Sequence, residues 1–342
     1  RDLTINALYT NISTGEIVDI TGKGVDDIKN HIIRTPNDPD TIYDDDPLRI
    51  LRCIRFASRY GWEIEYDTYE GMVRNVSRLE IITKERVKDE FCKMLTCKHP
   101  IMAMELLRKI GAMHYVIPEL EETYSMTQNE YHFGTVWEHT MMVLEGTKDD
   151  NMILRISALL HDIGKIRVCT EEDGKIHFLK HELKSGEMID ELLRPLKFSN
   201  EIIKEVTFLV RNHMICKTWG SECEYMKDKK LRRFQYECKT EERFRNLMTI
   251  IDADNNAYAA DKCMPKQVEF ILSRTEAMKA EGSAMFGYKL PLTGKEIMDL
   301  KGIKPGSAVK ECLDYLMKIA FANPLRKKEE FVKHLLGYRL QK

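Results

Sequence analysis

From Asp44 onward, apolar residues recur at the three- and four-residue intervals that place them on one face of a helix. The same periodicity predicts helices over 83–97, 100–111, 136–146, 152–163, 181–194, 200–213 and most of 264–342, with a break at 304–306. Before Asp44 the pattern predicts short strands at 17–20 and 31–35, around a short helix that follows Gly22. Pro39 then interrupts the pattern. We therefore expect a mostly α-helical chain behind a small α/β portion.

The composition is that of a globular protein, since 32% of the 342 residues are charged and 43% are hydrophobic. This length suggests two or three domains. No apolar run approaches the roughly 18 residues of a membrane span. Nine cysteines without a Cys-x-x-Cys pair indicate reduced thiols, and we expect a cytoplasmic protein. Because the net charge is −2, a nucleic acid would have to bind a local basic patch.

A cationic stripe is predicted near the start of the helical part. Asp46 and Pro47 have the features of a helix start, and Arg49, Arg52 and Arg55 follow at intervals of three. Each interval turns the side chain by about 60° and advances it by about 4.5 Å. Such a stripe could follow a base, a sugar and a triphosphate, because planar guanidinium groups bind phosphate through two bonds. The alternative is an ordinary solvated helix face.

Asp46 and Arg49 also fit the edge of a base. A carboxylate accepts a hydrogen bond from an exocyclic amino group, and a guanidinium donates one to the adjacent ring nitrogen. Cytosine and adenine both present that edge, whereas uracil and guanine present a carbonyl beside an N–H. The pair would therefore accept C and A and leave unpaired polar groups against U and G.

Two motifs, RDLTINAL at 1–8 and DDPLRILRCIRFA at 45–57, resemble those of the class II tRNA nucleotidyltransferases. This family comprises the CCA-adding enzymes and the bacterial poly(A) polymerases. The run 83–86 with Glu90, and the run 292–306, look like further family segments. The resemblance implies that CTP, ATP and tRNA are substrates. The implied roles are a protein template for the base (Asp46 and Arg49), phosphate binding (Arg52 and Arg55) and ribose recognition (Arg1 and Asp2).

The sequence departs from the family pattern in two places. Asp45 stands where the family usually has Glu. The Gly-x-Asp-x-Asp motif, which in the family binds two catalytic magnesium ions upstream of the motif at Arg1, does not occur. No catalytic carboxylates of that kind are therefore assigned here. We expect the 342 residues to bind nucleotide poorly, to transfer none, and to be a piece of a longer enzyme.

A second candidate site centres on the adjacent pair His161 and Asp162. Adjacent helical positions lie about 100° apart, so both side chains can converge on one ion. His139 and Asp254, from separate predicted helices, would complete a set of metal ligands. Mixed nitrogen and oxygen ligands suit a divalent ion that also binds water. A water molecule activated in this way can attack a phosphate ester. The alternative is a buried His–Asp hydrogen bond in a helical core.

The run YHFGTVWEH at 131–139, together with His161 and Asp162, resembles the HD phosphohydrolase superfamily, which some bacterial CCA-adding enzymes carry. Asp254 follows Ala253 as the last ligand does in that family, with Asp252 as the second choice. The resemblance implies a second metal or a phosphate at three further residues, His181, His213 and Lys165. The ion could be Mg, Mn, Ni, Co or Fe.

A basic region at 229–245 interleaves lysine and arginine with aromatic residues, among them Phe234 and Phe244. It could track an RNA backbone or form a solvated helix face. In all, the sequence predicts a mostly α protein. Its predicted parts are the end of an α/β nucleotidyltransferase head (1–43), a helical nucleotide-recognising neck (44–115), an HD-type metal-binding body (116–260) and a helical tRNA-binding tail (261–342).

The predicted function is the addition of CCA to tRNA with CTP and ATP. Poly(A) addition, an HD-type phosphohydrolase or 2′,3′-cyclic phosphodiesterase, and a non-catalytic RNA-binding module are the alternatives. We expect no membrane partner, and the sequence leaves the oligomeric state open.

Overall fold

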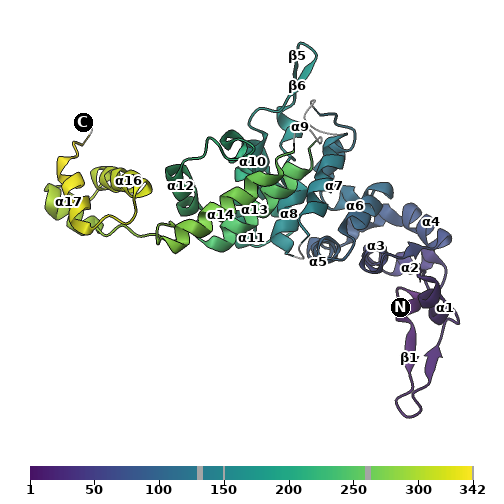
Figure 1. Cartoon of the computed structure of the whole chain (residues 1–342). Coiled ribbons are helices and arrows are strands. Elements are labelled where there is room, and N and C mark those ends of the chain that lie inside the picture. Colours follow the sequence, from purple (N-terminus) through teal and green to yellow (C-terminus); the bar gives the residue numbers. More distant parts are fainter. Residues whose placement is uncertain (129–133, 149–150, 259–262, 341–342) are drawn as a thin grey trace. The chain divides into compact units, whose positions relative to one another are not determined.

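The computed structural model describes residues 1–128, 134–148, 151–258 and 263–340 (Figure 1). The chain divides into two compact units. The first consists of Arg1–Met214 and Ala253–Cys263, and the second of Ile215–Asp252 and Met264–Lys342. Helix α13 (Glu241–Asn256) carries the chain from the second unit back into the first.

The first unit begins with short strands and continues as a series of helices. Its strands are β1 (Leu8–Thr10), β2 (Ile17–Asp19), β3 (Ile32–Ile33), β4 (Glu63–Ile64), β5 (Thr170–Glu172) and β6 (Lys175–His177). Its helices are α1 (Gly24–Asn30), α2 (Pro39–Asp45), α3 (Leu48–Tyr60), α4 (Tyr66–Asn75), α5 (Lys84–Leu95), α6 (Pro100–Lys109), α7 (Val136–Gly146), α8 (Met152–Leu160), α9 (Lys165–Val168), α10 (His181–Leu193) and α11 (Asn200–Asn212).

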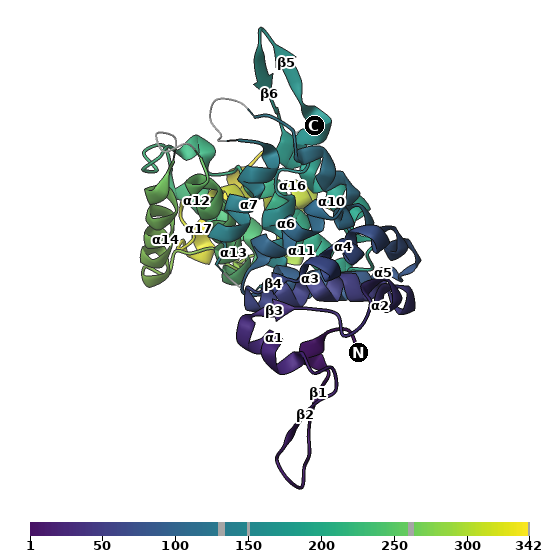
Figure 2. The same ribbon diagram turned by 90° about the vertical axis from the view of Figure 1, so that its right-hand side faces the viewer.

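The strands pair locally rather than forming one sheet. β1 and β2 form an antiparallel hairpin in which Leu8 lies opposite Asp19. This hairpin projects from the N-terminal end of the first unit (Figures 1 and 2). β3 pairs in parallel with β4, and β5 pairs antiparallel with β6. The β5–β6 hairpin was not predicted, although the turn residues Asp173-Gly174 between its strands are a typical hairpin signal.

Helix α2 corrects one expectation from the sequence. Pro39 does not interrupt the pattern but begins a helix, because proline fits the first helical turn, where its missing N–H has no partner to lose. The Asp38 carboxylate caps this helix by accepting a hydrogen bond from the Thr41 backbone N–H at 3.1 Å. The helical part of the chain therefore starts before Asp44.

Helix α3 lies at the centre of the segment that was predicted to form a neck (44–115). Its predicted apolar positions Leu51 and Ile54 are fully buried, and α3 packs against α5 and α6. Phe91 of α5 and Leu107 of α6 are buried in the same core. Because one face of α3 is buried here, Arg49 and Arg52 lie on less buried faces, whereas Arg55 is buried.

The HD-like part of the first unit is a bundle of α7, α8, α10 and α11, whose neighbours pack pairwise. Leu159 and Leu160 at the end of α8, with Val206 and Val210 of α11, are buried in its core. These apolar contacts fix the ends of the helices, which is where the histidines and aspartates of the second candidate site lie.

The second unit is entirely helical over its described residues. Besides the first part of α13, it contains α12 (Asp228–Cys238), α14 (Pro265–Ala280), α15 (Gly294–Lys301), α16 (Ser307–Ala322) and α17 (Lys328–Gly337). The predicted break near 304–306 is confirmed, since α15 ends before Gly302 and α16 begins at Ser307. The prediction of a mostly α protein with a small α/β start is also confirmed. None of the described helices has both the length and the apolar character that a membrane crossing requires.

Candidate nucleotide and metal sites

Asp46 lies at the junction between α2 and α3, one residue before the Pro47 cap of α3. Its Oδ1 accepts a hydrogen bond from the Leu48 backbone N–H at 3.2 Å. Its Oδ2 accepts one from Nη2 of Arg86, on α5, at 2.7 Å. The carboxylate is thus fixed at both oxygens by groups from two different elements. Arg86 was noticed in the sequence only as part of a family segment, and nothing there indicated this contact.

Arg49 is the second residue of α3 and follows Asp46 by three positions. Its Nη1 donates to the Ile42 carbonyl at 3.1 Å and to Oδ2 of Asp45 at 3.3 Å. No hydrogen bond joins the side chains of Arg49 and Asp46 within the described residues. The two groups are therefore anchored separately and keep hydrogen-bonding capacity for a third molecule.

Arg52 brings the two N-terminal motifs together. Its Nε and Nη2 lie 2.7 and 2.6 Å from Oδ2 of Asp2, a residue 50 positions away in the sequence. The other carboxylate oxygen of Asp2 accepts hydrogen bonds from the Leu3 backbone N–H and from Nδ2 of Asn6. Burial alone would raise the pKa of Asp2, but the bonds from Asn6 and Arg52 hold it below its usual value.

This ion pair leads to a stability prediction. Replacing Asp2 by Asn should lower the free energy of unfolding at pH 7 by about 2 kcal/mol, because a buried charged hydrogen bond is lost. The folded pKa of Asp2 is lower than 3.8, its value in the unfolded chain, so the contribution is complete above that pH. It should disappear as the pH falls through the folded pKa. Urea denaturation of both proteins at neutral and acidic pH measures this difference.

The control is Asp40→Asn, which breaks the exposed ion pair between Asp40 and Arg74. An exposed pair contributes at most about 1 kcal/mol. Equal losses in the two variants would contradict a special role for Asp2.

The other predicted nucleotide ligands lie elsewhere. Arg55 is buried, with its Nε 2.5 Å from Oε2 of Glu90 on α5. Arg1 is exposed and donates from Nε to the Tyr9 hydroxyl at 3.3 Å. The structure therefore brings Asp2 and Arg52 together near the start of the chain, but it places Arg55 against α5. The geometric reason is the 60° rotation at each interval, which carries Arg55 about 120° away from Arg49 around the helix.

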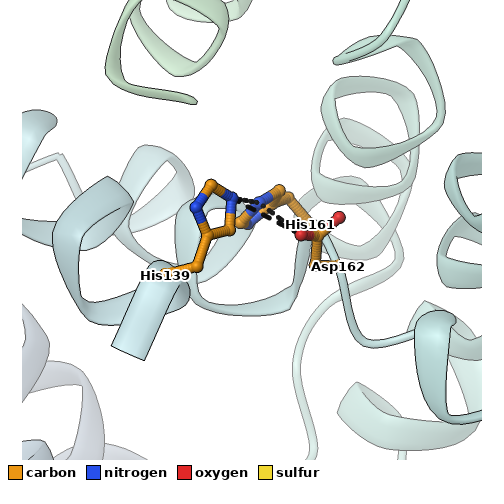
Figure 3. A group of neighbouring side chains, drawn as sticks. All are labelled: His139, His161 and Asp162. Atoms are coloured by element: carbon orange, nitrogen blue, oxygen red, sulfur yellow. Dashed lines mark hydrogen bonds and ion pairs between the residues drawn. The ribbon is translucent and has the colours of Figure 1, made fainter. Parts of the chain in front are cut away.

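The second site gathers side chains from the ends of several helices (Figure 3). His139 belongs to α7, while His161 and Asp162 directly follow α8. His181 is the first residue of α10, and His213 directly follows α11. The remaining member, Asp254, lies in the last turn of α13. Every one of these six residues is buried.

The four histidines share one orientation. Each has its Nδ1 near a backbone carbonyl: His139 to Ala257 at 3.3 Å, His161 to Ala158 at 2.8 Å, His181 to Phe178 at 2.9 Å and His213 to Val210 at 2.7 Å. An Nδ1–H that donates to a carbonyl leaves the lone pair on Nε2, and this is how metal-ligating histidines are commonly oriented. The Nε2 atoms face one another in pairs, 3.3 Å apart for His139 with His161 and for His181 with His213.

Asp162 lies between these two pairs. Its Oδ2 is 3.2 Å from Nε2 of His161 and 3.5 Å from Nε2 of His139. Its Oδ1 is 3.1 Å from Nε2 of His181 and 3.7 Å from Nε2 of His213. Two groups of possible metal ligands therefore share one carboxylate. Asp254 extends the first group, since its Oδ1 lies 3.2 Å from Nε2 of His139.

The electrostatics of this cluster follow from the burial of its charges. Burial would raise the pKa of Asp162, but His161, Lys165 and His181 hold it well below its usual value. Burial would lower the pKa of His161, yet Asp162 and Asp254 raise it. Burial and the neighbouring histidines lower the pKa of His213 to about 3. The cluster thus contains a carboxylate anion and a neutral imidazole at pH 7, as ligation of a divalent ion requires.

Lys165 contributes a buried positive charge to this cluster. Its Nζ lies 2.7 Å from Oδ2 of Asp162 and donates to Oε1 of Gln128 at 2.7 Å. No pattern in the sequence predicts the contact with Gln128. Both Lys165 and its carboxylate partner are almost completely shielded from solvent, so each compensates the charge of the other.

Gly164, two residues after Asp162, lies where there is no room for a side chain. A Cβ there would lie 2.3 Å from the Ser185 backbone N and 2.5 Å from the His181 carbonyl oxygen. Gly164→Ala should therefore push α10 and its histidine away, and we expect a loss of about 2–3 kcal/mol of stability together with reduced metal content. Gly294→Ala is the control, because its Cβ would meet nothing closer than Val309 at 3.6 Å. Thermal unfolding and elemental analysis measure both effects, and equal behaviour of the two variants would contradict the close approach.

The basic region at 229–245, in the second unit, is less accessible to RNA than its sequence indicates. Phe234 and Phe244 are buried, so these two rings are not part of a surface that could contact RNA. Arg232 is buried and donates to the Ala322 carbonyl at the end of α16 at 3.0 Å. Arg245 pairs with Glu241 and Glu276. These arginines stabilise the second unit internally.

Three family models match the chain in order. The poly(A) polymerase head domain matches residues 1–34, the probable RNA and SrmB-binding site of polymerase A matches 61–123, and the HD domain matches 129–255. The chain is therefore similar to poly(A) polymerases and tRNA nucleotidyltransferases, and residues 129–255 match the HD domain. These matches imply the use of a divalent metal ion.

Curated relatives extend this similarity over nearly the whole chain. An A-adding tRNA nucleotidyltransferase of Deinococcus radiodurans is 28% identical over 92% of this chain and 72% of its own length. A CC-adding tRNA nucleotidyltransferase of Thermus thermophilus is 27% identical over 99% of this chain and 76% of its own length. A multifunctional CCA protein of Neisseria gonorrhoeae is 32% identical over 63% of this chain, and the match spans only about half, 52%, of that relative.

Solved structures show the same fold. The Bacillus stearothermophilus CCA-adding enzyme in complex with CTP superimposes with a TM-score of 0.66 at 20% identity, covering 98% of this chain and 72% of the other. The Thermotoga maritima CCA-adding enzyme complexed with tRNA gives a TM-score of 0.51 at 18% identity, covering 98% of this chain and 72% of the other. The family fold therefore extends through both units.

Proposed function

We propose that this chain selects CTP and ATP for the addition of nucleotides to the 3′ end of tRNA. The observation that carries the proposal is the start of α3, where Asp46 and Arg49 are anchored by separate neighbours. A carboxylate and a guanidinium held in this way suit the amino group and ring nitrogen of cytosine or adenine. The names of the A-adding, CC-adding and CCA relatives support the same reaction.

Arg52 and Asp2 extend the proposed nucleotide site. Asp2 orients the guanidinium of Arg52, which is one-third exposed and can bind a phosphate oxygen. We propose Arg1 as a further ligand at the same end of the chain. We propose Arg55 only as a support of α3, because its Nε binds the buried Glu90.

The transfer step needs metal-bound carboxylates, for which we propose Mg²⁺. Gly-x-Asp-x-Asp does not occur in the 342 residues. The transfer activity is therefore proposed for an enzyme in which a head segment with that motif precedes Arg1. Within this chain, the residues bind and orient the nucleotide and the RNA.

The test is an assay on tRNA that lacks its terminal CCA, with such a head segment joined before Arg1. Incorporation from CTP and ATP, but not from UTP and GTP, would support the proposal. The length and composition of the product distinguish addition of CCA from addition of CC, A or a poly(A) tail. A protein that adds no nucleotide to such a tRNA, although folded and supplied with Mg²⁺, would refute it.

A second proposed function is supported by the histidine cluster. We propose that it binds two divalent ions, one between His139, His161 and Asp254 and the other between His181 and His213, with Asp162 shared. Mixed nitrogen and oxygen ligation is compatible with Mg, Mn, Ni, Co or Fe. When bound, such ions supply an activated water for the hydrolysis of a 2′,3′-cyclic phosphate or a phosphate monoester. Lys165 is positioned to neutralise negative charge beside Asp162.

This hydrolytic activity can be tested on the 342-residue chain itself. A 2′,3′-cyclic nucleotide should be hydrolysed in the presence of one of these ions, and His161→Ala should abolish the reaction. Metal binding without turnover would leave the cluster a structural centre and refute the enzymatic proposal.

We also propose the functional division into head (1–43), neck (44–115), HD body (116–260) and tRNA-binding tail (261–342), and a cytoplasmic location. The division does not coincide with the two compact units, because the first unit contains head, neck and body segments and residues 215–252 of the body belong to the second unit. It can be tested by tRNA binding to a chain in which surface lysines of the tail are replaced.

A further inference from the structure

Lys165 lies inside the histidine cluster, although an ammonium group cannot be a ligand of a metal ion. Only 2% of the residue is exposed. Its Nζ lies 2.7 Å from Oδ2 of Asp162 and donates to Oε1 of Gln128 at 2.7 Å. The same atom lies 5.2 Å from the centroid of the Phe178 ring, which stabilises a cation. The ammonium group is thus held by three neighbours, and it would have to give up one of them to bind a substrate phosphate.

Gln128 fixes the position of this ammonium group. Its Oε1 accepts the hydrogen bond from Lys165, and its Nε2 donates to the Thr135 carbonyl at 3.0 Å. Thr135 is the N-cap of α7, the helix that carries His139. Because both ends of the amide are engaged, the amide cannot turn and present its NH₂ group to the lysine without losing both bonds. Lys165 is therefore held beside Asp162 by a residue that is itself attached to α7.

The ion pair with Lys165 makes the two oxygens of Asp162 unequal. Oδ2, which lies next to the ammonium group, is also the oxygen nearest to His161 and His139 (Figure 3). Oδ1 lies near the other histidine pair, and no lysine or arginine among the described residues has it as its closest partner. We call an ion bound through Oδ2 the first ion and an ion bound through Oδ1 the second ion. Only the first ion would share its carboxylate oxygen with a fixed positive charge, and the two charges repel each other.

The carboxylates of the cluster do not compensate this repulsion completely. Within the described residues, the carboxylates that contact its histidines are Asp162 and Asp254. Two divalent ions and Lys165 would bring five positive charges against these two negative ones. The excess would lie among buried side chains, where the low local dielectric strengthens the interaction between charges. An anion that binds beside the first ion would therefore be strongly favoured.

We propose that Lys165 lowers the affinity of the cluster for the first ion, and that an anionic phosphate group bound beside this ion restores it. The metal ion and the phosphate of the substrate then bind cooperatively, because each offsets the charge of the other. Lys165 acts through the shared oxygen of Asp162, and Gln128 is the positioning residue that keeps it there. The proposal rests on the second proposed function, from which it takes the two ions, and it adds the dependence of one ion on the substrate.

The test is calorimetric titration of the 342-residue protein with Mn²⁺ at neutral pH. Lys165→Met removes the charge and keeps most of the apolar stem. It should tighten the binding of the first ion about 10-fold and change that of the second by less than about twofold. In a His213→Ala background, which lacks a ligand of the second ion, the remaining Kd should show the same tightening. Damage to the fold would weaken metal binding, so a tighter Kd is not expected from a merely structural role of Lys165.

A second variant keeps the test valid if Lys165→Met unfolds, since that change leaves the Asp162 carboxylate without its partner. Gln128→Met removes the acceptor of the lysine and leaves the charge in place. The loosened ammonium group should compete less well with the first ion, and its binding should tighten about threefold. An unchanged or weaker Kd for the first ion in every folded variant of Lys165 and Gln128 would overturn the proposal.

The matched control is Lys29→Met, which removes an exposed lysine of α1 whose ion pair with Asp26 lies outside the cluster. Both Mn²⁺ dissociation constants should stay within about twofold of those of the unaltered protein. A tightening in this control equal to that in Lys165→Met would mean that the overall charge of the protein, and not the position of Lys165, sets the affinity. That result would also overturn the proposal.

Inorganic phosphate measures the coupling between the ion and the anion. With phosphate present, and after correction for the complex that Mn²⁺ forms with phosphate in solution, the first ion should bind the unaltered protein about 10-fold more tightly. The gain should be smaller in Lys165→Met, which has one positive charge fewer. If Lys165 instead holds the phosphate itself, Lys165→Met will lose the effect of phosphate and leave the phosphate-free Kd unchanged, and the proposal is wrong.

Hydrolysis of a 2′,3′-cyclic nucleotide is measured separately. A protein whose metal affinity responds to Lys165→Met as expected, but which turns over no substrate, would refute the enzymatic proposal and leave the role of Lys165 standing. A protein that hydrolyses the substrate, with a first-ion Kd that does not respond to Lys165→Met, would support the enzymatic proposal and refute this one.

Discussion

An Asp162→Asn variant should lose essentially all of the bound divalent metal, whereas His213→Ala should lose about half of it. The reason is the position of Asp162 between the two groups of ligands. Its Oδ2 lies near His161 and His139, and its Oδ1 lies near His181 and His213. An asparagine replaces one of these oxygens by an NH₂ group, which cannot ligate a cation and leaves the two groups without their common anion.

Elemental analysis after dialysis against a single metal measures the result, and about two ions per chain are expected for the unaltered protein. His114→Ala is the matched control, because His114 is exposed and pairs with Glu121 outside the cluster. Retention of the full metal content by Asp162→Asn would contradict the bridging role. Loss of all metal in His213→Ala would contradict two separable ions.

The effect of Asp162→Asn on the free energy of unfolding is tested by a second comparison. Asp162→Asn removes the carboxylate that compensates the buried charge of Lys165. The free energy of unfolding should therefore fall by about 3–5 kcal/mol even without metal. Adding Lys165→Met should restore much of this loss but not the metal. This pair of measurements separates metal ligation from charge compensation.

The pH dependence of metal binding has a defined sign. The pKa of His161 is raised in the metal-free protein by Asp162 and Asp254, which outweigh the effect of burial. Protons and metal compete for its Nε2, so metal affinity should fall as the pH falls through this raised pKa. Titration with metal at pH 6 and pH 8 should show weaker binding at the lower pH, and the difference should be smaller in His161→Ala, which lacks this ligand.

The helices of this protein could be predicted from periodicity because each buries one face. The predicted ranges 136–146 and 152–163 correspond to α7 and α8 within a few residues. Pro39 was misinterpreted because its effect depends on the capping Asp38, which makes it the first residue of α2. The β5–β6 hairpin was overlooked because its strand residues are largely exposed and carry no apolar pattern.

For the candidate sites, the sequence predicts which residues take part but not which side chains contact one another. Spacing on α3 gives the direction of Arg55 but not the presence of Glu90 on another helix. Likewise, the sequence placed Asp2 and Arg52 in one nucleotide site without indicating that they bind each other. The pairing of His181 with His213 across a shared Asp162 depends on how α10 and α11 pack against α8. These contacts come from tertiary packing, which local patterns do not encode.

Asp46→Ala and Arg49→Ala should each reduce the preference for CTP and ATP over UTP and GTP by a factor of about 100 or more, measured as kcat/KM in the head-containing enzyme. The carboxylate and the guanidinium complement the amino-plus-acceptor edge, and against U or G both would face groups of the same hydrogen-bonding sense. Arg74→Ala is the control, since Arg74 forms an exposed ion pair on α4. A selectivity unchanged in both template variants would refute base recognition by this pair.

Arg86 offers a sharper test, because it acts through Asp46. Its Nη2 binds Oδ2 of Asp46 at 2.7 Å, while the Leu48 backbone N–H binds Oδ1, so the carboxylate plane is defined at both ends. Arg86→Ala leaves the backbone bond but allows the carboxylate to rotate. We expect about a 10-fold loss of kcat/KM for CTP and ATP alike, with a partial loss of selectivity that Arg86→Lys partly restores.

A purely structural role for Arg86 gives a different result. It would lower the stability of the junction between α2 and α3, and it would reduce the rates with all four nucleotides by the same factor. The discrimination between CTP and UTP would then stay intact, and the lysine variant would recover rate and stability together. Selectivity responds only if Asp46 itself contacts the base, because rotation of a carboxylate that touches no substrate cannot alter the choice between two bases. The ratio of the CTP and UTP rates in Arg86→Ala is therefore the measurement that decides whether the start of α3 is a template.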